Sequence, residues 1–335
     1  MRIAIIGAGL SGITLAENLK DVADIVIFEK SRGIGGRITT RFSKPFYFDH
    51  GAQYFTAKTA EFQEFLKSPI SEGFVKEWNL DCCEIDLKAK KLQKIVKKSY
   101  YVGSPKMNEL CKYFARKFPE NVVIKLKTRV VKISKNFGKW QIFDENNNYH
   151  DEFDLVISTI PPQQAIEIIP PQFKYFEDIK NYQMIGCYSL MLALKEKPDI
   201  KWNAVSAKNS KINWISFDSS KPNRILGKDE DGNEHYCFLI NSNNEWAQKH
   251  IEDDQEFVEN EMILEAQKIM KFSPENVVFS NLHKWRYANI GEQKGDKSLY
   301  DEKNKIAVCG DWLIQAKVES AFLSATDLVK KLKNL

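Results

Sequence analysis

The sequence of 335 residues predicts an α/β fold organised around a parallel sheet, and three observations near its start support this. Residues 3–6 are all apolar, as in a buried parallel strand. A G-x-G-x-x-G turn follows at once and leads into a helical apolar pattern. A second apolar run at residues 25–28 then ends in Glu29. In this order, these features are typical of a Rossmann-type unit that binds a dinucleotide.

Each glycine of the turn has a distinct expected role. Gly7 allows the tight turn, Gly9 lets the backbone approach a diphosphate, and Gly12 lets the helix pack closely on the strand. The diphosphate would lie at the helix N-terminus, where unpaired N–H groups favour anions. Glu29, placed 22 residues after Gly7, is expected to accept hydrogen bonds from ribose hydroxyls. The alternative is a glycine-rich turn without a ligand.

A glycine-rich loop with two arginines follows Glu29, at residues 30–37 (KSRGIGGR). A plain NAD domain would continue into another helix here, whereas this loop suits a second stretch of phosphate and a flavin. It resembles the R-x-G-G-R signature of FAD enzymes of the amine oxidase superfamily. The resemblance implies FAD as the cofactor; the alternative is an exposed loop with two solvated arginines.

Further segments resemble bacterial renalase-type flavoproteins along the whole chain. They are residues 48–56 (FDHGAQYFT), 101–107 (YVGSPKM), 283–288 (HKWRYA), 309–312 (CGDW) and 318–321 (VESA). Two departures stand out: Lys106 where the family pattern has glycine, and QAK at 315–317 in place of a more glycine-rich approach to the last helix. Both departures fall in loops that are expected near the flavin.

The scattering of these segments predicts a discontinuous cofactor domain. The resemblance implies a Rossmann-type FAD-binding domain with an inserted α+β substrate domain, of the amine oxidase/p-hydroxybenzoate hydroxylase type. We expect residues 1–70, 105–165 and 285–335 to form the FAD-binding domain, and residues 71–104 and 166–284 to form the substrate domain. The substrate domain is expected to contain a sheet that covers the flavin with one face. Ser104 and Pro105 predict a helix start, as N-cap and first helical residue.

The candidate cofactor residues come from these motifs. Val130 (or Val131) is placed by the resemblance on a strand that clamps the adenine, although a plain meander strand is the alternative. Asp311 follows an apolar strand and is placed for ribityl hydroxyls or phosphate, and Val318 opens a helix whose N-terminus would stabilise a reduced flavin. The full set expected to bind FAD is Gly7, Gly9, Ser11, Gly12, Glu29, Lys30, Gly36, Arg37, Gln53, Tyr54, Val130, Gly310, Asp311 and Val318.

The substrate pocket has four candidate residues: His50, Tyr188, Trp285 and Tyr287. Trp285 and Tyr287 alternate on one strand and therefore share a face, either as a flat wall opposite the flavin or as core. His50 is expected to make a structural hydrogen bond more readily than to act in acid/base chemistry. No catalytic residue is assigned, because the flavin N5 atom accepts the hydride.

The resemblance to renalases implies oxidation of 2- and 6-dihydroNAD(P) isomers to NAD(P)+, with O2 reduced to H2O2. Two alternatives remain open. A flavin-containing amine oxidase would share every cofactor motif quoted above. A non-catalytic relative, comparable to the GDP-dissociation inhibitors, would not need the loop at 32–37 or the Gly310-Asp311 pair.

Composition argues against several other classes of partner. Net charge is only +4, from 49 basic and 45 acidic residues, and the lysine-rich stretch 88–98 is interleaved with apolar residues. It predicts a solvated face, so we expect no nucleic-acid partner. The six cysteines lack metal-ligand spacing, and no apolar run reaches the ~18 residues of a membrane span. We therefore expect no metal, no membrane contact and a cytoplasmic location, with a small-molecule substrate and O2 as partners. The oligomeric state stays open.

Overall fold

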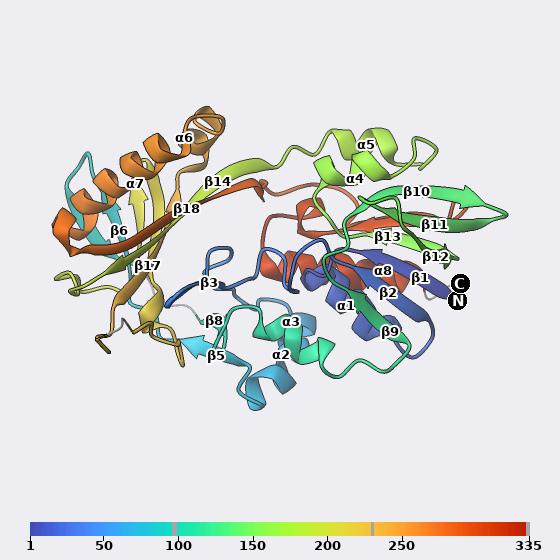
Figure 1. The fold of residues 1–335 in the computed structure, drawn as a ribbon, viewed down its shortest axis with the longest axis horizontal. Helices are drawn as coiled ribbons and strands as arrows, with labels where there is room; N and C mark the ends of the chain where they lie inside the picture. The colour runs from blue at the N-terminus through green and yellow to red at the C-terminus, as the bar shows by residue number, and fades with distance from the viewer. Residues whose placement is uncertain (96–98, 229–230, 333–335) are drawn as a thin grey trace.

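The computed structural model describes residues 1–95, 99–228 and 231–332 and consists of two sheet-based regions side by side (Figure 1). The first contains a six-stranded sheet of order β19-β20-β13-β1-β2-β9, parallel except for β19, which confirms the predicted α/β class. Its strands are β1 (Arg2–Ile6), β2 (Asp24–Phe28), β9 (Val122–Lys125), β13 (Leu155–Ser158), β19 (Ser298–Asp301) and β20 (Ile306–Cys309).

Alternation along β1 gives this sheet two covered faces. Ile3 and Ile5 pack in one apolar core together with helices, whereas Ala4 and Ile6 pack in a second core on the opposite face. The first core includes α1 (Leu10–Leu19), α2 (Ala60–Ser71), α3 (Glu109–Ala115) and α8 (Val318–Leu332). The second includes the small sheet β10 (Val130–Asn136), β11 (Lys139–Asp144) and β12 (Tyr149–Phe153), with α4 (Pro162–Ile168) and α5 (Phe176–Lys180).

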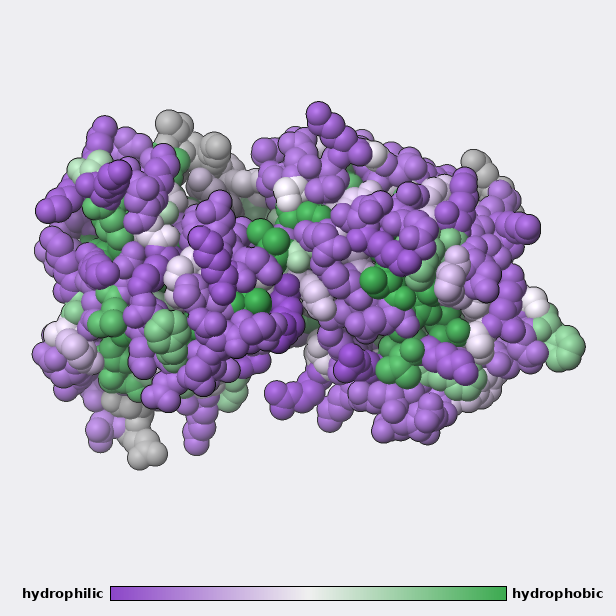
Figure 2. All heavy atoms as spheres, turned by 90° about the horizontal axis from the view of Figure 1, so that it is seen from above, coloured by the Kyte–Doolittle hydropathy of each residue, from purple (hydrophilic) through white to green (hydrophobic). Residues whose placement is uncertain are grey.

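The second region is a seven-stranded sheet of order β18-β14-β17-β16-β15-β6-β7. One face packs on α6 (Asn244–Lys249) and α7 (Gln255–Met270), and the other packs on the hairpin β3 (Arg41–Ser43) and β4 (Phe46–Phe48). Its strands are β6 (Cys82–Asp86), β7 (Lys91–Lys94), β14 (Ile185–Leu194), β15 (Ala204–Lys208), β16 (Ile212–Phe217), β17 (Tyr236–Ser242) and β18 (Val277–Asn289). In Figure 2 a notch separates two lobes, with hydrophilic side chains over most of the visible face.

Packing departs from the predicted domain boundaries at three places. β18 runs without interruption through residue 285, where a boundary was expected. The strand pair β5 (Val75–Trp78) and β8 (Tyr100–Gly103) packs in the core of the first region, and so does α5. The boundaries themselves stay a prediction.

The predicted helix start at Ser104 and Pro105 is wrong, since α3 begins at Glu109. Tertiary hydrogen bonds hold the preceding backbone in a turn. The Met107 N–H donates to Thr40 Oγ1 at 2.7 Å, and the Arg224 guanidinium donates to the carbonyl oxygens of Gly103 and Pro105 at 2.8 and 2.6 Å. A helix starting at Ser104 would itself use two of these groups, the Met107 N–H and the Pro105 carbonyl oxygen.

The lysine-rich stretch lies at an edge of the seven-stranded sheet. All four residues of β7 are exposed, as expected for a solvated face, while residues 96–98 of the stretch lie outside the described residues. In the described ranges, no helix is both long and apolar enough to cross a bilayer. The six thiols are free and buried, and burial raises the pKa of Cys82 to about 11 and that of Cys83 as well.

Candidate active site

A cavity of about 1800 Å³ lies between the two regions. Its wall combines the glycine turn, residues 28–43 and 50–59, the start of α8, and one face of the seven-stranded sheet. Pockets for single small ligands measure roughly 300–1,000 Å³. This cavity therefore has room for a dinucleotide together with a second molecule.

The glycine turn is shaped for close approach of a ligand. A Cβ built on Gly9 meets nothing within 4 Å, although Gly9 lies in the cavity wall. By contrast, a Cβ on Gly12 would overlap the Gly7 carbonyl oxygen, so Gly12 serves helix packing as expected. No side chain caps the N-terminus of α1. An open space beside uncapped helix N–H groups fits a diphosphate.

Glu29 is buried beside this turn at the end of β2. Its carboxylate accepts hydrogen bonds from the Ala8 N–H at 2.9 Å and the Ser31 N–H at 2.8 Å. The same side chain lines the cavity. Glu29 thus joins the glycine turn to the basic loop, and its remaining lone pairs stay available to a ribose.

Replacing Glu29 with alanine is expected to weaken FAD retention by about tenfold or more, because two charge-assisted bonds and the ribose acceptor are lost together. Flavin content after gel filtration and FAD titration of the stripped protein measure the effect. Glu29→Gln keeps one acceptor oxygen, so its FAD retention should fall between those of Glu29→Ala and the wild-type protein. Unchanged flavin content in Glu29→Ala would refute the assignment.

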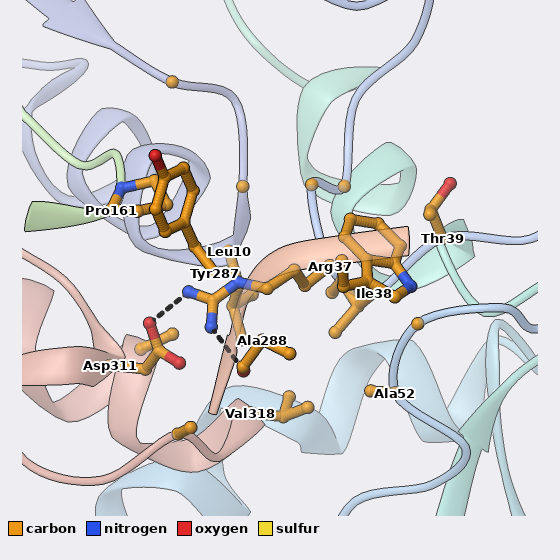
Figure 3. A pocket seen from close by; sticks show the side chains of 18 of the residues that line it. Leu10, Arg37, Ile38, Thr39, Ala52, Pro161, Tyr287, Ala288, Asp311 and Val318 are labelled. Carbon is orange, nitrogen blue, oxygen red and sulfur yellow. Dashed lines mark hydrogen bonds and ion pairs between the residues drawn. The ribbon is translucent and has the colours of Figure 1, made fainter. Parts of the chain in front are cut away.

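Arg37 crosses the cavity wall and ties three elements together (Figure 3). Its guanidinium donates to the Ala288 carbonyl oxygen of β18 at 3.2 Å and pairs with the Asp311 carboxylate. Asp311 was expected to face ribityl hydroxyls or phosphate; it lines the cavity, but one carboxylate oxygen is already used by Arg37. The pair thus fixes the basic loop against the C-terminal segment.

The start of α8 is held against the opposite loop by Glu319. This carboxylate accepts hydrogen bonds from the Lys58 N–H, the Thr59 N–H and the Thr59 hydroxyl, at 2.7 to 3.1 Å. Ser11 donates to the Ala321 carbonyl oxygen at 2.9 Å and joins α1 to α8. These contacts hold the N-terminal end of α8 at the cavity, and Val318 lines the cavity wall.

Most of the predicted cofactor residues line this one cavity. They are Gly7, Gly9, Ser11, Glu29, Lys30, Gly36, Arg37, Gln53, Tyr54, Val130, Asp311 and Val318. Gly12 and Gly310 do not line it. The Gly310 N–H donates to Ser324 Oγ at 2.8 Å, and a Cβ there would press against the Trp312 ring, so Gly310 serves packing. Contact of the lining residues with FAD stays a prediction.

Tyr188 is a correction to the predicted substrate pocket. Its ring is fully buried on the opposite face of β14, and its hydroxyl donates to the His250 carbonyl oxygen at 2.8 Å. Trp285 pairs across the sheet with Cys187, and both line the cavity. Because side chains alternate along a strand, the residue next to Cys187 must point away. His50, Trp285 and Tyr287 do line the cavity.

Three aromatic rings meet where β18 approaches the loop at residues 49–54. The His50 and His283 ring centroids lie 4.9 Å apart, and the Trp285 ring is 5.1 and 4.5 Å from them, respectively. Trp285 Nε1 donates to the His50 carbonyl oxygen at 2.8 Å. Burial, then His283 and Arg41, lowers the pKa of His50 to about 3; burial and Arg41 lower the pKa of His283 to about 4. Both imidazoles are therefore neutral at physiological pH.

These two neutral histidines predict loss of stability in mild acid. Below their ordinary value of 6.5 the unfolded chain takes up protons that the folded chain accepts only near pH 4 and pH 3. Stability should fall between pH 6.5 and 4 by about 3–5 kcal/mol, with His283 contributing the smaller part because solvent screens it, and His50→Asn/His283→Asn should flatten that slope. Denaturant unfolding at a series of pH values measures it. An identical slope in the double variant would exclude these groups as the cause.

A buried charge cluster supports the loop that carries His50. The Asp49 carboxylate pairs with Lys221 Nζ at 2.9 Å and with Arg224, and Asp218 pairs with Lys221 at 2.7 Å. The Asp49 N–H also donates to Asp218 at 2.7 Å. Burial alone would raise the pKa of Asp49, but the charges of Arg224 and Lys221 lower this pKa to about 2. The carboxylate thus stays charged and fixes the loop.

Gln53 braces the same loop. Its amide donates to the carbonyl oxygens of Asp49 and Gly51, and its Oε1 accepts from the Ser216 hydroxyl. Its polar atoms are therefore engaged within the protein, which limits the polar flavin contact expected of it. The Tyr54 ring packs edge-on against the Tyr100 ring, with 4.7 Å between the ring centroids. Burial raises the pKa of Tyr54 to about 12.

Sequence reasoning missed the residues that act across long separations. Arg41, Lys221 and Arg224 belong to no local motif that would single them out, whereas Glu319 lies in the segment at 318–321 that resembles renalases. A weak signal existed for Asp49, since it lies inside the segment at 48–56 that resembles renalases.

Solved structures share this fold over nearly the full length. A candidate protoporphyrinogen oxidase from Exiguobacterium is 10% identical with a TM-score of 0.78, covering 99% of this chain and 98% of that one. An oxidoreductase from Methanosarcina mazei is 15% identical with a TM-score of 0.72, covering 98% and 100%. Wild-type putrescine oxidase bound to putrescine is 10% identical with a TM-score of 0.68, covering 100% of both chains. At these identities the likeness concerns the fold.

Two family models match the chain. Residues 5–68 match the NAD(P)-binding Rossmann-like domain, which contains the glycine turn and the basic loop. Residues 83–329 match the flavin containing amine oxidoreductase family. The second match spans most of the chain, and the cavity between the two sheets suits the cofactor of that family. The chain therefore belongs to the flavin-containing amine oxidoreductases, and its cofactor is FAD.

Proposed function

We propose that the protein oxidises dihydronicotinamide dinucleotides reduced at the 2- or 6-position to NAD(P)+, and that O2 with one solvent proton becomes H2O2. FAD, when bound, supplies the hydride acceptor and passes the electron pair to O2. The chain's own residues bind and orient the substrate and keep water away. The segments at 48–56 and 283–288, which resemble renalases, both contribute to the cavity.

The observation that carries this proposal is the charge of the sheet-side wall. Among the described residues, the carboxylates that line the cavity are Glu29, Glu167, Asp311 and Glu319. None belongs to the seven-stranded sheet, to residues 39–43 or to residues 50–56, and these parts contribute the cation Arg41. Lys284 and Arg286 border the cavity through their backbone, since their charged groups bind the Ile251 carbonyl oxygen and the Glu252 carboxylate. A protonated amine would find no counter-ion there, whereas a dinucleotide brings its own negative charge.

The wall also offers unpartnered polar atoms beside flat aromatic surfaces. Trp214 Nε1, a donor, and Asn241 Oδ1, an acceptor, are buried in the cavity wall without a hydrogen-bond partner among the described residues. Buried polar atoms are nearly always paired, so both atoms have unused hydrogen-bonding capacity beside the cavity. A nicotinamide has one carbonyl oxygen and one amide nitrogen, which match an acceptor–donor pair, and its ring matches Trp285.

Amine oxidation is the second candidate, favoured by the description of the matching family. Its strongest structural support is the neutral state of His50 and His283, since an amine must be deprotonated before it loses a hydride. The same neutrality suits a nicotinamide equally, so this observation alone does not separate the two reactions.

Anaerobic mixing separates the candidates. The FAD-loaded protein is mixed with 2-dihydroNAD(P), 6-dihydroNAD(P), ordinary NADH and a panel of amines that includes putrescine, and loss of visible flavin absorbance is followed. We expect rapid bleaching with the 2- or 6-isomers and slow or no bleaching with NADH and the amines. Bleaching by an amine but by neither isomer would overturn the proposal in favour of the second candidate.

A further inference from the structure

Arg41 is a half-buried cation in the cavity wall without a counter-ion. It lies on β3, the first strand of the hairpin that follows the basic loop and packs on the seven-stranded sheet through β4 (Figure 1). Throughout the described residues, no hydrogen bond or ion pair engages its guanidinium group. An unpaired charge in a partly buried position is costly, so a chain that keeps one there has a use for it.

The surrounding charges confirm that Arg41 is in excess. The nearby carboxylates Asp49 and Asp218 are already paired with Lys221 and Arg224 inside the buried cluster. Two carboxylates thus face two cations, and the Arg41 charge is left over. Arg41 pairs with Phe48 across the hairpin, two residues before His50, which places it at the aromatic end of the cavity. Its charge accordingly disfavours protonation of both His50 and His283.

This position differs from the expected place of the cofactor diphosphate. The open space at Gly9 and the uncapped start of α1 lie at the glycine end, whereas Arg41 lies opposite Phe48 in the hairpin that leads to His50. Within the cavity, Arg41 is therefore available to a second molecule. A planar guanidinium pairs bidentately with phosphate oxygens, which is the geometry that favours arginine over lysine for this group.

We propose that Arg41 binds a phosphate oxyanion of the substrate and selects nucleotide substrates over uncharged ones. The inference rests on the proposed function for the identity of that substrate and adds the residue that recognises it. A substrate without phosphates should therefore bind the wild-type protein more weakly than the dinucleotide does. In a variant without Arg41, removal of the phosphates should not weaken binding further.

The test compares Arg41→Gln with Lys44→Gln in the FAD-loaded protein. Lys44 is an exposed residue of the same hairpin outside the cavity, so its substitution gives the same change of net charge. Arg41→Gln should raise KM for the 2- and 6-dihydro dinucleotides about 10- to 100-fold with little change in kcat. It should leave the corresponding dihydronicotinamide ribosides, which lack phosphate, within about twofold of wild type. Lys44→Gln should match wild type throughout.

A binding measurement keeps this inference separate from the proposed reaction. Inorganic pyrophosphate and NAD+ are titrated into the oxidised, FAD-loaded proteins by calorimetry, where no turnover is needed. Weaker binding of both probes by Arg41→Gln, but not by Lys44→Gln, supports the inference. This holds even if the wild-type protein oxidises no isomer, a result that would overturn the proposed function but not this inference. Three results would each overturn the inference. The first is equal probe binding in all three proteins, and the second is an equal rise in KM for riboside and dinucleotide in Arg41→Gln. The third is loss of FAD from Arg41→Gln.

Discussion

Replacing Lys221 with methionine is expected to lower the free energy of unfolding by about 3–5 kcal/mol, the usual cost of breaking a buried ion pair from one side. The Lys221 side chain is fully buried and bridges Asp49 and Asp218. Without it, Asp218 has no cation and Asp49 retains only Arg224. Because the Asp49 N–H is bound to Asp218, the loop carrying His50 and Gln53 should shift as well.

Denaturant unfolding of the FAD-loaded protein, followed by tryptophan fluorescence, measures this loss. Lys201→Met is the control, since its ion pair with Asp199 is almost wholly exposed and should contribute little to stability. Adding Asp218→Asn to Lys221→Met should recover part of the stability, because the uncompensated charge is removed. If the single variant is as stable as wild type, the cluster does not hold the loop.

Gly9→Ala is expected to lower the affinity for FAD at least about tenfold while leaving the fold intact. The added methyl group enters open space, so the protein without cofactor should fold as before. That space lies in the cavity wall beside the start of α1, where the diphosphate is expected. The methyl group would hold the diphosphate away from the helix N–H groups.

Flavin content after gel filtration and the melting temperature of the stripped protein separate these two effects. Gly291→Ala provides a matched control, because its Cβ also meets nothing and the residue lies outside the cavity wall. Gly12→Ala should behave in the opposite way and destabilise the stripped protein, since its Cβ overlaps the Gly7 carbonyl oxygen. Full flavin retention by Gly9→Ala would remove the diphosphate from this site.

The cofactor half of the site was predictable because its signals are local. Strand, glycine turn, helix, second strand and Glu29 follow one another within thirty residues, so their spacing alone determines where they meet. In the structure β1 and β2 pair in parallel, the glycine turn and α1 connect them, and Glu29 directly follows β2. Physical constraints of this kind need no knowledge of distant contacts.

The substrate half was harder, for two physical reasons. Nearly every residue of β14 is buried, so its sequence lacks the polar alternation that would show which face meets the cavity, and Tyr188 was assigned to the wrong one. The contact between Lys221 and Asp49 spans 172 residues, and no local pattern encodes it. The helix start at Ser104 failed because tertiary partners outcompeted a good local signal.

The contacts of Asp311, Glu319 and Ala321 with the N-terminal loops have a consequence for biosynthesis. A chain leaving the ribosome displays its glycine turn almost three hundred residues before these three partners are translated. Until then α1 has no α8 to pack against, and the groove lacks one side. The groove that would hold the flavin therefore becomes complete only after the last helix has been translated.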